Sequence, residues 1–267
     1  MYKYPGSKQN RSPELAERLE RLGPTSEYQE PFLGGASVAL TFLEHNPQVS
    51  TVWLNDIRPE LIALWRAVRD YPDEIGERLG RLPRHMPTLQ DEFYDVVVDV
   101  RATTSVSEDK DDLLELAVAA LLVQQMSFNG IPAETPVNDN RIPWNPEFYH
   151  EKAKSVSDLF NGRNVRLTAS EFAPLLRAPG DATIFLDPPY YMEGNRLYRH
   201  GMSVADHIRL ARLLRECPHR WLLTYDDHPF LRRLYRWAKV ETVKAVYRNR
   251  PDLAPARLAT ELVITAG

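Results

Sequence analysis

The residues best suited to chemistry are Asp187-Pro188-Pro189-Tyr190, which directly follow the apolar run Thr183-Ile184-Phe185-Leu186. Because proline has no N–H to donate to a sheet, two consecutive prolines turn the chain away from the strand. A carboxylate, a backbone carbonyl and an aromatic ring then stand at the carboxyl end of a strand, where ligands of parallel α/β sheets bind. The structural alternative is a loop in which the aspartate only caps a turn.

These groups suit methyl transfer to a planar amine. The exocyclic N6 amine of adenine is a poor nucleophile because its lone pair is delocalised into the ring. Hydrogen bonds from its two N–H groups to the Asp187 carboxylate and the Pro188 carbonyl favour a tetrahedral nitrogen whose lone pair is available. Tyr190 is expected to stack on the base, an interaction of about 1–3 kcal/mol. This chemistry needs neither a metal nor a covalent enzyme intermediate.

A second group of residues indicates a nucleoside site. Phe32-Leu33-Gly34-Gly35 follows a predicted strand as a glycine turn, and Ser37 begins the next helix. Asn55-Asp56 ends the following strand, where an acidic side chain can accept hydrogen bonds from ribose hydroxyls. Asp56 could also cap a helix that begins at Ile57. Since the full Gly-x-Gly-x-x-Gly fingerprint is absent, the pattern does not distinguish NAD from S-adenosylmethionine.

Short apolar runs that alternate with helical patterns predict an α/β fold with a mostly parallel sheet. The expected strands cover residues 26–30, 51–55, 165–168, 182–187, 221–225, 240–246 and 258–265. The expected helices cover residues 13–21, 37–45, 58–69, 203–215 and 229–237. The fourth of these helices begins with Ser203 and Asp206 at the spacing of a capping box.

The alternation breaks between Tyr71 and Pro146. Helices are expected there over residues 72–81, 89–102 and 111–126, followed by a stretch rich in proline and asparagine. We therefore divide the chain into a catalytic domain, residues 1–70 and 147–267, and a mainly helical inserted domain, residues 71–146.

Composition excludes several classes of protein. Hydrophobic residues make up 43% of the chain and charged residues 26%, which is ordinary for a soluble globular protein. Cys217 is the single cysteine, so intrachain disulfides and cysteine-rich zinc sites are excluded, and the seven histidines show no metal-ligand spacing. No apolar run reaches the roughly 18 residues of a membrane span, and the N-terminus lacks a signal core, so a cytoplasmic location is expected.

The net charge of −4 does not by itself favour a nucleic-acid partner. Its distribution is uneven, because acidic residues dominate residues 70–120 and basic residues dominate residues 196–257. The C-terminal third can therefore present a basic face to a partner, although solvated helix faces would give the same count.

Taken in order, the motifs resemble those of the Dam-type DNA adenine N6-methyltransferases over nearly the whole chain. The matching segments are Tyr4 to Lys8, Pro31 to Ser37, Asn55-Asp56, Ser170-Glu171-Phe172, Asp187 to Tyr190, Tyr225 to Tyr235 and Glu261 to Ile264. The resemblance implies a Rossmann-like methyltransferase sheet with helices on both faces, S-adenosylmethionine as the cofactor and double-stranded DNA as the substrate. The catalytic residues that it implies are Asp187, Pro188 and Tyr190.

The resemblance also implies a set of cofactor contacts, with Phe32 and Lys8 near the methionine end and Asp56 at the ribose. The full set is Tyr4, Lys8, Phe32, Gly34, Asp56, Phe172 and Asp187. Without the resemblance, Lys8 could equally be a solvated surface lysine.

Target recognition is assigned by the same resemblance to the insertion, residues 71–146. Family members carry basic and aromatic residues after the turn that matches Phe128-Asn129-Gly130, whereas residues 131–141 here hold a single arginine. The candidate DNA contacts are Phe128, Asn129, Asn138, Arg141, Tyr198, Arg248, Arg250 and Arg257, with Lys3 and Arg11 near the entrance. The target base must be flipped out of the duplex, because N6 is unreachable within the stack.

Several alternatives stay open at this point. The enzyme could be solitary or work beside a cognate restriction endonuclease. The same chemistry could act on RNA adenine, on the N4 amine of cytosine in DNA or on a protein amide. A catalytically silent DNA-binding protein of the same fold is a further alternative. A nicotinamide dehydrogenase is disfavoured, because Pro188-Pro189-Tyr190 has no role in hydride transfer.

Overall fold

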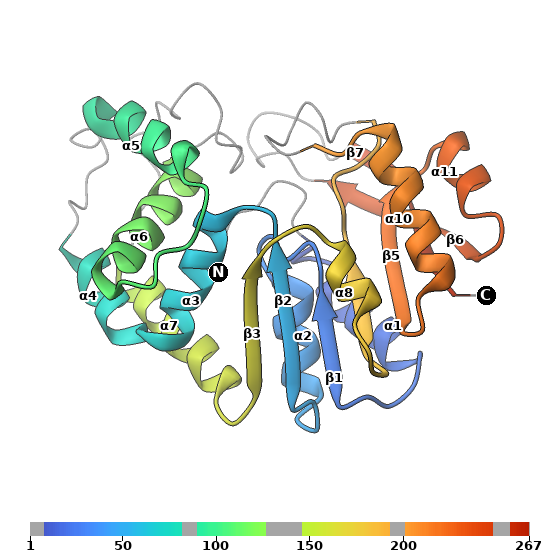
Figure 1. Cartoon of the computed structure of the whole chain (residues 1–267), viewed down its shortest axis with the longest axis horizontal. Helices are drawn as coiled ribbons and strands as arrows, with labels where there is room; N and C mark the ends of the chain where they lie inside the picture. The colour runs from blue at the N-terminus through green and yellow to red at the C-terminus, as the bar shows by residue number, and fades with distance from the viewer. Residues whose placement is uncertain (1–7, 82–89, 127–145, 193–200, 248–256, 267) are drawn as a thin grey trace.

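The computed structural model describes residues 8–81, 90–126, 146–192, 201–247 and 257–266, and it forms an α/β fold around one sheet (Figure 1). Seven strands pair in the order β3-β2-β1-β4-β5-β7-β6. The strands are β1 (Glu27–Glu30), β2 (Thr51–Asp56), β3 (Asn164–Ala169), β4 (Thr183–Leu186), β5 (Arg220–Asp226), β6 (Lys239–Tyr247) and β7 (Arg257–Thr265). The five strands from β3 to β5 are parallel, and β7 runs antiparallel to both of its neighbours.

Helices cover both faces of this sheet, as expected from the sequence. In Figure 1, α8 and α10 lie in front of the sheet, and α1 and α2 lie behind it. The helices are α1 (Ser12–Glu20), α2 (Ser37–His45), α3 (Pro59–Asp70), α4 (Pro72–Gly80), α5 (Gln90–Ala102), α6 (Lys110–Met126), α7 (Pro146–Phe160), α8 (Ala173–Arg177), α10 (Val204–Glu216) and α11 (Pro229–Leu234).

The predicted helical block lies beyond the β3 edge of the sheet, where α4, α6 and α7 pack against α3 (Figure 1). Its buried residues, such as Leu79 and Leu121, belong to the same apolar cluster as Val52 of β2 and Trp65 of α3. The block and the sheet therefore share one continuous core. The domain boundaries drawn from the sequence stay predictions.

The predicted strands agree with the observed ones to within one residue at each end. The Ser203 capping box is also confirmed: the Ser203 hydroxyl accepts from the Asp206 N–H, and the Asp206 carboxylate accepts from the Ser203 N–H. Two helices, α7 and α8, were not predicted. The predicted helix over residues 229–237 ends early at Leu234, where the Tyr235 N–H bonds back to the Leu231 carbonyl.

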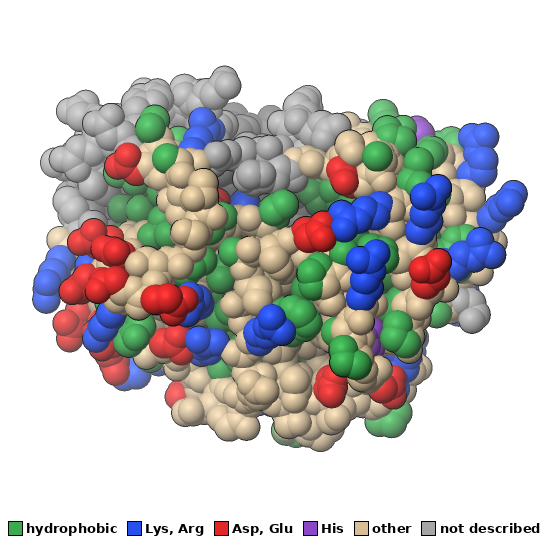
Figure 2. Space-filling view, viewed as in Figure 1, with side chains coloured by type: hydrophobic (Ala, Val, Ile, Leu, Met, Phe, Trp, Pro, Cys, Tyr) green, Lys and Arg blue, Asp and Glu red, His purple; other side chains and the backbone are tan. Residues whose placement is uncertain are grey.

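Charge is distributed unevenly over the surface. On the face shown in Figure 2, acidic side chains gather over the helical block, and lysine and arginine side chains gather over α10 and α11. Arg212 and Arg215 of α10 and Arg232 and Arg233 of α11 are exposed. The uneven distribution of charged residues along the sequence therefore corresponds to an uneven distribution of charge over this face of the protein.

Within the described part of the chain, no helix is long and apolar enough to cross a membrane. The same residues contain no group of three or more histidine, cysteine, aspartate or glutamate side chains placed to hold a metal ion.

Candidate active site

The turn after β1 lies between the ends of β1 and β2 and is held from both sides. Gly34 has a φ of 48° and Ala36 a φ of 53°, the left-handed conformation that a tight turn requires. The Gly34 N–H donates to the Asp56 carboxylate at 3.0 Å, and the Gly34 carbonyl accepts from the indole N–H of Trp65 at 3.2 Å. The backbone of this glycine turn therefore has a fixed position at the sheet edge.

Asp56 ends β2 as a buried carboxylate. One of its oxygens binds the glycine turn, and the other accepts from the backbone N–H of Arg58 at 3.1 Å and from the Arg58 guanidinium at 3.2 Å. The alternative that Asp56 caps a helix beginning at Ile57 is wrong. The helix α3 begins at Pro59 with Arg58 in the N-cap position, because proline fits the first turn of a helix.

Aromatic and amide side chains connect the ends of β1, β2 and β3. The side-chain amide of Asn55 donates to the Pro31 carbonyl at 3.0 Å and to the Ser170 carbonyl at 2.8 Å. The rings of Phe32 and Phe172 lie 5.4 Å apart, and Phe172 is buried. Phe32, Asp56 and Phe172, three of the residues expected to contact a cofactor, thus lie along one edge of the sheet.

Asp187 directly follows β4 and is held by two neighbours. Its Oδ1 accepts from the Thr224 hydroxyl of β5 at 2.6 Å and pairs with the Lys8 ammonium at 3.2 Å. Lys8 itself is 6% exposed, so the alternative of a solvated surface lysine is wrong. The carboxylate thus has a cation and a hydroxyl on one side and remains 21% exposed.

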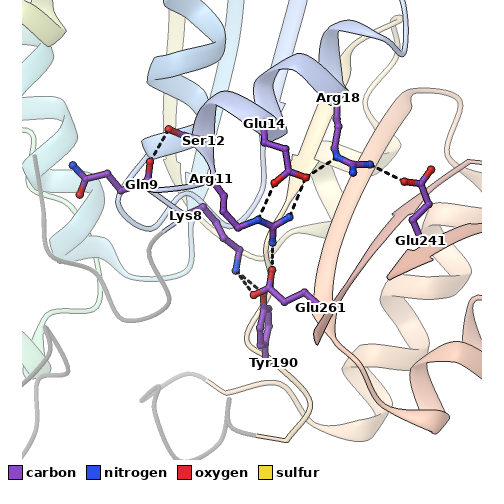
Figure 3. A network of polar contacts seen from close by, with 9 residues as sticks. All are labelled: Lys8, Gln9, Arg11, Ser12, Glu14, Arg18, Tyr190, Glu241 and Glu261. Carbon is purple, nitrogen blue, oxygen red and sulfur yellow. Dashed lines mark hydrogen bonds and ion pairs between the residues drawn. The ribbon is translucent and has the colours of Figure 1, made fainter. Parts of the chain in front are cut away.

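Tyr190 lies beside this pair in a wider polar network, which Figure 3 shows. Its hydroxyl accepts from the Lys8 ammonium and donates to the Glu261 carboxylate of β7 at 2.7 Å. Glu261 also accepts from Lys8 at 3.3 Å and from the guanidinium of Arg11. Side chains from the N-terminal segment, the β4 loop and β7 therefore meet at Asp187.

Burial shapes the protonation of the carboxyl groups at this edge. Burial raises the pKa of Asp187 above its ordinary value, while the Lys8 charge and the Thr224 hydroxyl act to lower that pKa. Glu30, at the end of β1, is fully enclosed, and burial raises its pKa well above the ordinary range, with Asp187 and Asp56 adding to the effect. The Tyr28 hydroxyl donates to Glu30 at 2.6 Å. Of the two carboxyl groups, Asp187 has the cation that favours the ionised form.

The loop after Tyr190 is fixed by the end of β5. The Asp226 carboxylate accepts from the backbone N–H groups of Tyr191 and Met192 at 2.9 and 3.0 Å. The Tyr191 ring stacks on Phe230 of α11 with ring centroids 4.9 Å apart. These contacts hold the chain close to Asp187 after it has left the sheet.

Most of the expected DNA contacts lie outside the described residues. These are Phe128, Asn129, Asn138, Arg141, Tyr198, Arg248 and Arg250, together with the expected cofactor contact Tyr4. Arg257 begins β7 opposite Tyr247, and only its backbone is described. The guanidinium of Arg11 is bound by Glu261 and Glu14, which argues against the expected role at a phosphate entrance.

Two residues of the site were given no role from the sequence, although Glu261 lies in one of the segments that resemble the family. Thr224 is a fully buried hydroxyl in the otherwise apolar run of β5, and Glu261 is a buried charge directly before Leu262-Val263-Ile264. A polar residue in a buried strand requires a partner, because an unpaired buried polar group is costly. That signal was available, although it does not identify the partner.

Comparison with known proteins places this geometry in context. The chain is 24% identical to the type II methyltransferase M1.LlaDCHI of Lactococcus lactis, over 94% of this chain and 91% of that one. It is 27% identical to a DNA adenine methylase of Vibrio cholerae, over 86% of this chain and 84% of that one. Among solved structures, the magnesium protoporphyrin IX methyltransferase of Synechocystis is 10% identical with a TM-score of 0.43, over 97% of this chain and 79% of that one.

A family model identifies the chain more specifically than these individual relatives. The model for the D12 class of N6 adenine-specific DNA methyltransferases matches residues 4–249, which include every residue of the Asp187 site except Glu261. Because this match covers most of the chain, the protein belongs to the D12 class of N6 adenine-specific DNA methyltransferases.

Proposed function

We propose that this protein methylates N6 of a flipped-out adenine at specific sites in double-stranded DNA, and that Asp187, Pro188 and Tyr190 carry the reaction. Family membership gives the reaction, and the placement of Asp187 supports its assignment to these residues. Its carboxylate directly follows β4 at the carboxyl edge of the sheet, accepts from Thr224 and pairs with Lys8. A carboxylate fixed in this way is a hydrogen-bond acceptor with a defined direction.

S-adenosylmethionine, the methyl donor of this family, supplies an electrophilic methyl group on its sulfonium when bound. The residues present fit this group. Asp56 offers carboxylate oxygens for ribose hydroxyls, the Phe172 ring offers apolar surface to an adenine ring, and the neighbouring Phe32 ring offers apolar surface to the methionine end. We assign these three residues, with Lys8, Gly34 and Asp187, to cofactor binding, and Tyr4 remains a prediction from the sequence.

Two acceptor groups of the protein are proposed to orient the target amine for attack. The Asp187 carboxylate and the Pro188 carbonyl accept hydrogen bonds from the two N–H groups of the amine, which orients the nitrogen lone pair away from the ring plane. The Tyr190 ring holds the base by stacking, which contributes about 1–3 kcal/mol. Lys8 favours the ionised, accepting form of Asp187, because an opposite charge lowers a carboxyl pKa.

DNA recognition is assigned to the helical block and the segments beside it. The candidate DNA contacts in residues 127–145, 193–200 and 248–256 are assigned from the resemblance of the sequence motifs to those of the family. Because relatives include type II methyltransferases, a cognate restriction endonuclease is a candidate partner in the same system.

The assignment is tested by identifying the methylated product. The protein is incubated with labelled S-adenosylmethionine and unmethylated DNA, RNA or protein, and each polymer is digested for product identification. We expect N6-methyladenine from double-stranded DNA. Transfer only to RNA or protein, or N4-methylcytosine as the product, would contradict the proposal.

Activity is expected to depend on pH through Asp187. The ionised carboxylate is the form that accepts hydrogen bonds, so activity is full above the pKa of Asp187 and falls as pH drops through it. Because burial raises this pKa, the acid limb should lie at higher pH than an exposed aspartate would give. The measurement is kcat against pH.

The variant Thr224→Val provides the control for this pH dependence. The Thr224 hydroxyl lowers the pKa of Asp187, so its removal should move the acid limb to still higher pH. A limb that stays in place in Thr224→Val would assign the titration to another group.

Asp56→Ala is expected to weaken cofactor binding. The change removes the proposed ribose acceptor and releases the Gly34 N–H, which Asp56 holds at 3.0 Å. Each lost hydrogen bond to a charged group is worth about 1.5–3 kcal/mol, so the Kd should rise at least tenfold. Isothermal titration calorimetry measures the Kd, and Asp70→Ala at the end of α3 is the control. Unchanged affinity in Asp56→Ala would remove this residue from the cofactor site.

A further inference from the structure

Glu261 occupies an unusual position for a charged residue. It lies on β7 opposite Asp226, the last residue of β5, and is 1% exposed. The strand β7 runs antiparallel to β5, so Glu261 lies at the edge where the parallel strands end. A carboxylate in this position is enclosed by the protein and must be matched by partners.

The two oxygens of the Glu261 carboxylate bind different partners. Oε1 accepts from the Lys8 ammonium at 3.3 Å and from the Tyr190 hydroxyl at 2.7 Å, and Oε2 accepts from the Arg11 guanidinium (Figure 3). Lys8 in turn pairs with Asp187 at 3.2 Å. Two carboxylates and two cations therefore alternate in one network, in which each buried charge has an opposite charge beside it.

We infer that Glu261 is a positioning residue, which fixes the Lys8 ammonium and the Tyr190 ring relative to the Asp187 carboxylate. The inference rests on the function proposed above. Glu261 is enclosed, and its carboxylate binds the side chains of Lys8, Tyr190 and Arg11, so it acts on the reaction through Lys8 and Tyr190.

The geometry indicates why such a residue matters. Lys8 is the residue proposed to bind the cofactor beside Asp187, and Tyr190 carries the ring proposed to hold the target base. Both side chains are hydrogen-bonded to the same oxygen of Glu261. This one carboxylate therefore sets the distance between the Lys8 ammonium and the Tyr190 ring. Displacement of reacting groups by about 1 Å can cost 10²-fold in rate.

The test compares Glu261→Gln with the wild-type enzyme in steady-state methylation of DNA. Glutamine keeps the shape of the side chain and removes its charge, which loosens both Lys8 and Tyr190. We expect kcat to fall about 10- to 100-fold, with the KM values for S-adenosylmethionine and DNA within about threefold of wild type. The variant Glu261→Asp, which keeps the charge, should recover part of the lost kcat.

Glu241→Gln is the matched control. Glu241 of β6 binds an arginine as Glu261 does, since it accepts from Arg18 of α1 at 2.8 Å, but it lies away from Lys8 and Tyr190 (Figure 3). It should retain wild-type kcat. Equal losses of kcat in the two variants would overturn the inference and leave only a structural role for Glu261.

A pH profile separates positioning from simple damage to the fold. The charged groups that face Asp187 are Lys8 from the N-terminal segment, Glu261 from β7 and Glu30 from β1, and the hydroxyls of Thr224 and Tyr225 come from β5. The Lys8 charge lowers the pKa of Asp187 more than the Glu261 charge raises it, so Glu261→Gln, which loosens Lys8, should move the acid limb of kcat to higher pH. A profile that only scales down, with its limb unmoved, would contradict the inference.

Tyr190→Phe provides a second test should Glu261→Gln fold poorly. Phenylalanine keeps the ring and loses the hydroxyl that Glu261 holds, so kcat should fall about tenfold with a nearly unchanged KM for DNA. Wild-type kcat in Tyr190→Phe would overturn the inference. If the wild-type enzyme methylated no adenine in DNA, the proposed function would fail instead, and the two failures are thus distinguishable.

Discussion

Replacing Asp187 with alanine is expected to lower kcat by about 10²- to 10³-fold while the protein stays folded, since loss of one preorganised group commonly has an effect of this size. The change removes the hydrogen-bond acceptor proposed for the target amine, and it also removes the carboxylate with which Lys8 pairs. Lys8 keeps Glu261 and Tyr190 as partners, so no buried cation is left alone. Removing a carboxyl whose pKa is raised by burial also relieves a desolvation cost.

Single-turnover formation of N6-methyladenine measures this effect apart from product release. Asp181→Ala is the matched control, because Asp181 precedes the same strand β4 at its opposite end and is exposed. Asp187→Asn should be nearly as inactive as Asp187→Ala, because the amide presents donors as well as an acceptor and cannot pair with Lys8. Activity above a tenth of wild type in Asp187→Ala would show that another group prepares the amine.

Trp65→Ala is expected to have the largest effect on stability. Trp65 lies on α3, is fully buried and belongs to the core shared by the sheet and the helical block. Truncation of a buried tryptophan lowers the free energy of unfolding by about 3–5 kcal/mol. The change also removes the indole N–H that donates to the Gly34 carbonyl, so the glycine turn loses one of the hydrogen bonds that hold it.

Chemical denaturation measures this loss, and two variants make it specific. Trp53→Ala should cost much less, because Trp53 is only half-buried and stacks against the Arg166 guanidinium at the surface. Trp65→Phe should keep most of the packing and lose the hydrogen bond, so its main effect should be a weaker affinity for S-adenosylmethionine. If Trp65→Ala and Trp53→Ala destabilised the protein equally, the shared core would not be the source of the effect.

The strands and most helices were predictable because their apolar patterns are local. Strands such as β4 and β5 are mainly apolar runs, and the capping box at Ser203 is a spacing of three residues. The helix α7 was missed although Tyr149, Ala153, Val156 and Phe160 form a buried face at helical spacing. Its many polar residues and the proline-rich stretch before it concealed that periodicity.

The partners within the site were less predictable than its motifs. The sequence predicted that Asp187, Tyr190, Asp56 and Phe32 lie at one edge, because the ends of parallel strands meet there. It did not predict the contact between Lys8 and Glu261, which are 253 residues apart. That contact depends on β7 entering the sheet between β5 and β6, and the order of strands in a sheet is not a local property of the chain.

This strand order also has a consequence for how the enzyme is made. Of the seven strands, β7 is the last along the chain, yet it lies inside the sheet and connects β6 to β5. A nascent chain whose β7 is still inside the ribosome lacks the strand that pairs with β6. It also lacks the Glu261 carboxylate, which binds Lys8, Arg11 and Tyr190. The ability to methylate is therefore expected only after β7 has been made, when this strand closes the sheet around residues made much earlier.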